Sequence, residues 1–122
     1  MANHVLLVED NELARDALRL LLQATGHRVS VAGSVGEALN VARAERPDLV
    51  LLDLTLPDGD GLQVVRELLV EGQPPTFVAL TGHDAADVAE RCVAAGCASV
   101  IVKPVSSAQL LATVDPLLAK RV

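Results

Sequence analysis

The chain has 122 residues, of which 51% are hydrophobic, a length and composition that suit one globular domain and exclude a disordered chain. Its formal net charge of −6, with Phe77 as the only aromatic residue, excludes the basic, ring-bearing surfaces that bind nucleic acids. No apolar run reaches the roughly 18 residues of a membrane helix, and no signal peptide opens the chain, so a cytoplasmic location is expected. The two cysteines, Cys92 and Cys97, are expected to be buried free thiols.

Apolar runs and helical patterns alternate five times along the chain. The expected strands are His4–Val8, Arg28–Ala32, Leu49–Asp53, Thr76–Leu80 and Ser99–Val102. The expected helices are Asn11–Ala24, Val35–Arg46, Leu62–Val70, Ala85–Ala95 and Ser107–Leu118. Ser34 and Glu37 form a capping-box pattern, Leu54–Gly61 is expected to be a loop, and Pro116 is expected to kink or shorten the last helix.

This alternation predicts an α/β fold with a parallel sheet. Parallel strands need crossover connections, and crossover helices cover both faces of the sheet. Right-handed crossovers then make the chain a single doubly wound domain. The strand at Arg28–Ala32 alternates apolar and polar residues, so it is expected nearer the sheet edge.

Polar residues gather at the carboxyl ends of the expected strands, where open α/β sheets bind their ligands. These residues are Glu9, Asp10, Asp53, Thr81 and Lys103. Carboxylates about 5 Å apart repel by on the order of 3 kcal/mol per pair, and a single lysine offsets only part of this. Since the side chains available as metal ligands are all hard oxygen donors, Mg²⁺ or Mn²⁺ is expected to neutralise the remaining negative charge. The pattern predicts a phosphoryl-transfer site with a carboxylate nucleophile.

Four motifs, each at an expected strand end, resemble those of the response-regulator receiver family over essentially the whole chain. They are Val8-Glu9-Asp10-Asn11, Asp53-Leu54-Thr55-Leu56-Pro57-Asp58-Gly59-Asp60-Gly61, Leu80-Thr81-Gly82 and Val102-Lys103-Pro104. The resemblance implies one receiver domain over residues 1–122, with a flavodoxin-like sheet in the strand order 2-1-3-4-5.

The same resemblance implies the chemistry. Asp53 would accept a phosphoryl group from a histidine kinase or a histidine phosphotransfer domain, and Lys103 would pair with that group. The implied metal ligands are Glu9, Asp10, Asp53 and the backbone carbonyl of Thr55. The Lys103–Pro104 peptide would be cis. The domain would weakly catalyse its own phosphorylation and dephosphorylation, and it would switch conformation through Thr81.

Two positions depart from the family pattern. Val100 stands where the family switch normally has an aromatic residue, which leaves a phosphorylation-independent interaction scaffold as an alternative. Glu9 stands where aspartate is commoner, an opening found in receivers of hybrid sensor kinases. The sequence therefore leaves open whether the chain is a stand-alone protein or part of a longer one.

Other functions fit less well. An aspartyl phosphatase would need a second acid where Thr55 stands, and a flavin site would need aromatic rings. His83, two residues after Thr81, is expected to be an exposed loop residue rather than a flank of the site. The nearly uncharged last helix leaves open a homodimer through the fourth helix, the fifth strand and the fifth helix.

Overall fold

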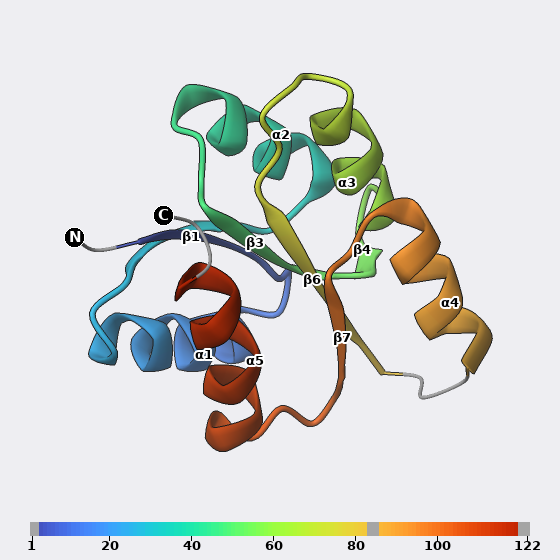
Figure 1. Ribbon diagram of the computed structural model, residues 1–122. Helices are drawn as coiled ribbons and strands as arrows, with labels where there is room; N and C mark the ends of the chain where they lie inside the picture. The colour runs from blue at the N-terminus through green and yellow to red at the C-terminus, as the bar shows by residue number, and fades with distance from the viewer. Residues whose placement is uncertain (1–2, 83–85, 120–122) are drawn as a thin grey trace.

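Five parallel strands form the sheet at the centre of the computed structural model, which describes residues 3–82 and 86–119 (Figure 1). The strands are β1 (His4–Val8), β2 (Arg28–Ala32), β3 (Leu49–Asp53), β6 (Thr76–Thr81) and β7 (Ser99–Val102). Their order is β2-β1-β3-β6-β7, which is the expected 2-1-3-4-5 order when the sheet strands are counted along the chain. The strand β2 lies at the edge, as expected.

Helices cover both faces of this sheet. They are α1 (Glu12–Ala24), α2 (Val35–Ala44), α3 (Leu62–Leu69), α4 (Ala86–Ala95) and α5 (Ser107–Ala119). The helices α1 and α5 lie on one face, and α2, α3 and α4 lie on the other (Figure 1). Within residues 3–82 and 86–119, none of these helices is long and apolar enough to cross a membrane.

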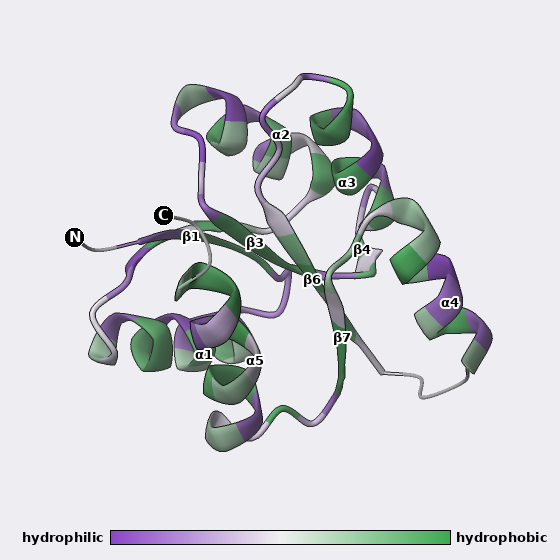
Figure 2. Cartoon of the chain, viewed as in Figure 1, coloured by the Kyte–Doolittle hydropathy of each residue, from purple (hydrophilic) through white to green (hydrophobic). Residues whose placement is uncertain are grey.

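The strands separate two apolar cores because successive strand residues point to opposite faces. Val5 and Leu7 pack with the cluster that includes Leu22 of α1 and Leu110 of α5. Residues one position away along the same strands pack into the second cluster, which holds Phe77 and residues of α2, α3 and α4. In Figure 2 much of the sheet is coloured hydrophobic, whereas the helices carry both hydrophobic and hydrophilic residues. The doubly wound prediction is confirmed.

Some expected boundaries are wrong by one or two residues. The helix α2 ends at Ala44 rather than Arg46, because Pro47 disfavours helical backbone in the residue before it. The strand β6 continues to Thr81, which pairs in register with Val102. The helix α5 continues past Pro116 to Ala119, so the proline does not shorten it; the expected start of α4 at Ala85 lies outside the described residues.

The segment expected to be a loop after β3 contains a short hairpin. Its strands are β4 (Thr55–Leu56) and β5 (Gly59–Asp60), and Thr55 pairs with Asp60. Strands of two residues are too short to show an alternating apolar pattern, which is why the sequence did not predict them. The hairpin starts two residues after Asp53 and therefore frames one side of the sheet edge.

Candidate functional site

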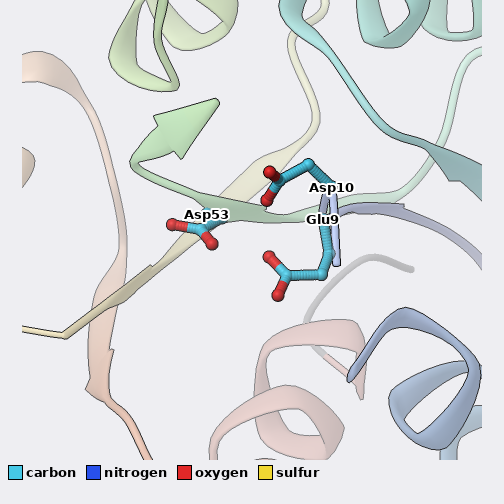
Figure 3. Close-up of side chains that lie close together, drawn as sticks. All are labelled: Glu9, Asp10 and Asp53. Atoms are coloured by element: carbon cyan, nitrogen blue, oxygen red, sulfur yellow. The ribbon is translucent and has the colours of Figure 1, made fainter. Parts of the chain in front are cut away.

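Three carboxylates meet where β1 and β3 end. Each of Glu9, Asp10 and Asp53 offers an oxygen atom, and these atoms all lie within 4.8 Å of one another. Figure 3 shows the three side chains, two from the residues after β1 and one from the end of β3. Glu9 and Asp53 are buried, with 2% and 8% of their surface exposed, whereas Asp10 is exposed. The cluster is thus open to solvent on the Asp10 side.

Lys103 connects two of these acids from the loop after β7. Its Nζ donates to Asp53 Oδ2 at 2.7 Å and to Glu9 Oε1 at 3.3 Å. The backbone N–H of Lys103 donates to the carbonyl of Thr81 at 2.7 Å, and the Lys103–Pro104 peptide is cis as expected. These contacts fix the ammonium group beside the Asp53 carboxylate.

The pKa values of these groups show how the cluster shares its charge. Burial raises the pKa of Glu9 to about 7, with a further contribution from its hydrogen bond to Asp53 and the Asp53 charge. Burial alone would raise the pKa of Asp53, but hydrogen bonds from Glu9 and Lys103 outweigh it and leave that pKa lowered. Of these two buried acids, Asp53 is therefore the one that stays ionised more readily, as a nucleophile requires.

Backbone geometry holds the Asp53 carboxylate from the other side. The N–H of Thr55 donates to Asp53 Oδ1 at 3.0 Å, and the N–H of Gly61 donates to the carbonyl of Leu54 at 2.8 Å. A Cβ atom at Gly61 would fall well inside the 3.0 Å that real Cβ atoms respect, against the carbonyl oxygen of Asp53. Only glycine allows the hairpin to return this close to the end of β3. The motif from Asp53 to Gly61 did not predict this close approach.

Thr81 and Val100 lie on neighbouring strands. Thr81 is buried at the end of β6, beside the β3 strand that Asp53 ends. Val100 is half-buried and packs against the core on the α4 side of the sheet. His83, the further candidate from the sequence, lies outside the described residues.

The donor set fits a hard divalent cation. Lys103 forms ion pairs with both buried acids, Glu9 and Asp53. The exposed Asp10 adds a third carboxylate, with an oxygen within 4.8 Å of theirs. Mg²⁺ takes a few carboxylate or carbonyl oxygens and keeps several waters, which suits a cluster open on one side. Among residues 3–82 and 86–119, this is the one group of three or more acids, histidines or cysteines arranged to hold a metal ion.

An apolar groove of about 230 Å³ runs from the acidic cluster along α1. It is lined by Glu9, Ala14, Ala17, Leu18, Lys103, Pro104 and Val105. On the same helix, Leu13 and Leu20 expose 84% and 59% of their surface. Neither leucine lines the groove itself.

Comparisons with known proteins agree with the motifs. The family model of the response regulator receiver domain matches residues 5–115. The transcriptional regulatory protein AfsQ1 of Streptomyces coelicolor is 36% identical over 95% of this chain and 51% of its own length. The polar-differentiation response regulator DivK of Brucella anthropi is 34% identical over 93% of this chain and 94% of its own length.

Solved structures share the fold. The chemotaxis response regulator CheY4 of Vibrio cholerae superposes with a TM-score of 0.91 at 26% identity, covering 96% of this chain and 99% of that one. The chain spans about half the length of AfsQ1 and nearly all of DivK.

Proposed function

Because the chain belongs to the response regulator receiver family, we propose that Asp53 accepts a phosphoryl group from a phosphohistidine of a two-component or phosphorelay partner. The observation that supports this most directly is the position of Asp53. One of its oxygens accepts from Lys103 at 2.7 Å and the other from the backbone of Thr55 at 3.0 Å, inside a cluster of three acids. Such a carboxylate is oriented and ionised before a substrate arrives.

The transfer forms one bond and breaks one. A lone pair of an Asp53 carboxylate oxygen attacks phosphorus, and the electrons of the phosphorus–nitrogen bond return to the imidazole of the donor. Lys103 neutralises negative charge on the phosphoryl oxygens, and the hydroxyl of Thr81 donates a hydrogen bond to the product. The same geometry supports slow phosphorylation from small phosphodonors and slow hydrolysis by water, which is weaker activity than that of an ordinary enzyme.

The proposed ligands of Mg²⁺ or Mn²⁺ are Glu9, Asp10, Asp53 and the backbone carbonyl of Thr55. When bound, the ion supplies positive charge that stabilises the phosphoryl oxygens during transfer. The raised pKa of Glu9 shows that burial and the neighbouring Asp53 disfavour a second charged acid in the metal-free cluster. Metal binding and deprotonation of Glu9 are therefore expected to occur together.

The phosphodonor is proposed to be a protein, either a histidine kinase or a histidine phosphotransfer domain. A donor histidine must reach Asp53, and the groove along α1 includes the cluster residues Glu9 and Lys103. The groove also includes Ala14, Ala17 and Leu18 of α1, which offer the donor protein an apolar surface beside the site. We propose that the domain works in the cytoplasm with its donor and does not contact nucleic acid directly. A homodimer through α4, β7 and α5 is a further proposal, which the exposed Val93 of α4 supports.

Val100 favours a second candidate function. A valine has no ring to move between a buried and an exposed position, so coupling between Thr81 and the α4 side of the sheet rests on smaller packing changes. In that case the domain is an interaction scaffold whose partners do not depend on phosphate. The acidic cluster argues for the first function, because a scaffold has no use for buried acids beside a lysine.

Intact mass measurement separates the two functions. The wild type, an Asp53→Asn variant and an Asp16→Asn control are incubated with Mg²⁺ and a small phosphodonor such as acetyl phosphate. The wild type and the Asp16→Asn control are expected to gain one phosphoryl group, and Asp53→Asn none, with no gain by any protein in EDTA. A wild type that gains no phosphoryl group would support the scaffold.

A further inference from the structure

The hairpin β4–β5 is anchored at its tip to a helix that is distant in sequence. Asp58, between the two short strands, accepts from the backbone N–H of Val35 at 2.8 Å through Oδ1 and from that of Gly36 at 3.0 Å through Oδ2. Both donors belong to the first turn of α2, and these contacts lower the pKa of the Asp58 carboxyl group. The sequence predicted a loop over Leu54–Gly61 but no partner for the Asp58 carboxylate.

The first turn of α2 therefore has two capping side chains, Ser34 and Asp58, which bind different backbone N–H groups. Ser34, the residue before the helix, accepts from the N–H of Glu37 at 3.1 Å. Asp58 binds the two N–H groups before that one, and its negative charge lies at the positive end of the helix dipole. Ser34 stabilises only the helix, whereas Asp58 also fixes the hairpin.

The other end of the same hairpin touches the proposed phosphoacceptor. Thr55 of β4 donates its N–H to Asp53 Oδ1 at 3.0 Å and pairs with Asp60 of β5. Asp58 lies three residues after Thr55, so a two-pronged anchor at the tip restricts rotation of a hairpin that has only two paired positions. The carbonyl of Thr55, a proposed metal ligand, moves with that hairpin.

We propose that Asp58 is a positioning residue for the metal site: by tying the hairpin tip to the first turn of α2, it holds the Thr55 carbonyl and the Asp53 carboxylate in the geometry that binds Mg²⁺. This inference rests on the proposed function, since it concerns the same cation. Loss of an outer partner that orients a metal ligand typically weakens metal affinity by about 10- to 100-fold. Because Asp58 acts on one or two of the ligands, about a tenfold loss is expected.

The test compares the Mg²⁺ dissociation constants of wild type, Asp58→Ala, Asp58→Asn and Ser34→Ala by titration calorimetry, at a temperature where circular dichroism shows each to be folded. Asp58→Ala is expected to bind Mg²⁺ about tenfold more weakly. Asp58→Asn, whose amide keeps one acceptor oxygen, should fall between it and the wild type. Ser34→Ala loses a cap of the same helix turn and should melt lower, but it should keep the wild-type affinity.

Each result bears on the inference. Equal affinities for wild type and both Asp58 variants would overturn it while leaving the proposed function intact. An equal loss of affinity in Ser34→Ala would overturn it as well, because the effect would then belong to the stability of α2. A wild type that binds no Mg²⁺ would overturn the inference and the proposed metal site together. If Asp58→Ala does not fold, Asp58→Asn against Ser34→Ala decides the question alone.

Discussion

Substitution of Gly61 by alanine should damage both the stability and the chemistry of this domain. The new Cβ atom would overlap the carbonyl oxygen of Asp53 and lie 3.1 Å from both its carbonyl carbon and Leu54 Cα. Backbone atoms cannot change rotamer to relieve this, so β3 and the hairpin must separate by about 1 Å. Overpacking of this kind typically lowers the free energy of unfolding by about 1–3 kcal/mol. We expect a loss toward the upper end of this range, because the clash is with backbone atoms.

Two measurements follow from that displacement. A loss of about 3 kcal/mol should lower the melting temperature by on the order of 10 °C in a domain of this size, measured by far-ultraviolet circular dichroism. A shift of about 1 Å at a reacting carboxylate typically costs on the order of 100-fold in rate. The proposed phosphorylation of Asp53 by acetyl phosphate, followed by intact mass, should slow accordingly.

Gly36→Ala is the matched control for this prediction. A Cβ atom at Gly36 would meet only Asp58 Oδ2, at 3.6 Å, which is ordinary contact. Since alanine also favours a helix more than glycine does, this variant should melt at or above the wild-type temperature. The reasoning is refuted if Gly61→Ala melts within about a degree of the wild type and accepts phosphate at the same rate.

Three further predictions concern the metal, the protons and the thiols. Mg²⁺ at 100 times its dissociation constant should raise the free energy of unfolding of the wild type by about 2.7 kcal/mol. EDTA should reverse this effect, and the Asp10→Asn substitution should largely remove it. An equal stabilisation of Asp10→Asn by Mg²⁺ would contradict the ligand assignment. In metal-free protein the folded state binds the Glu9 proton more tightly than the unfolded state, because the Glu9 pKa rises from 4.5 to about 7. The stability that this proton supplies is complete below a pH of 4.5 and is lost as the pH rises to about 7. The melting temperature of the wild type should therefore fall progressively below that of Glu9→Gln over this pH range. A difference in melting temperature that stays constant with pH would contradict the prediction. Burial raises the pKa of the Cys92 thiol, and that of Cys97 to about 12, so a thiol reagent at neutral pH should label the two only after unfolding, and fast labelling of native protein would show that they are not buried.

Most of the fold was predictable because its signals are local and periodic. Strand β3 is five consecutive buried residues that end on Asp53, and α1 repeats its apolar residues at helical spacing after the capping residue Asn11. Parallel strands place their carboxyl ends at one edge, which is why Glu9, Asp53 and Lys103 were expected together. The structure brings all three within hydrogen-bonding distance.

The hairpin and its anchor could not be predicted in the same way. Asp58 contacts Gly36 across 22 residues, and no spacing rule connects a turn residue to a helix that precedes it by that distance. The need for glycine at position 61 likewise depends on how closely the hairpin approaches Asp53, which only the folded backbone defines. A run of Asp and Gly residues signals a turn but not the partner of each carboxylate.

The isolation of Phe77 makes this domain unusually convenient for spectroscopy. Phe77 is the only Phe, Tyr or Trp residue of the sequence, and it lies in β6 with 1% of its surface exposed. Labelling with fluorophenylalanine would therefore give a single fluorine resonance. That resonance would report from the strand that ends at Thr81, free of overlap and without any substitution in the sequence. A nuclear magnetic resonance titration could therefore follow packing in this core as ligands are added.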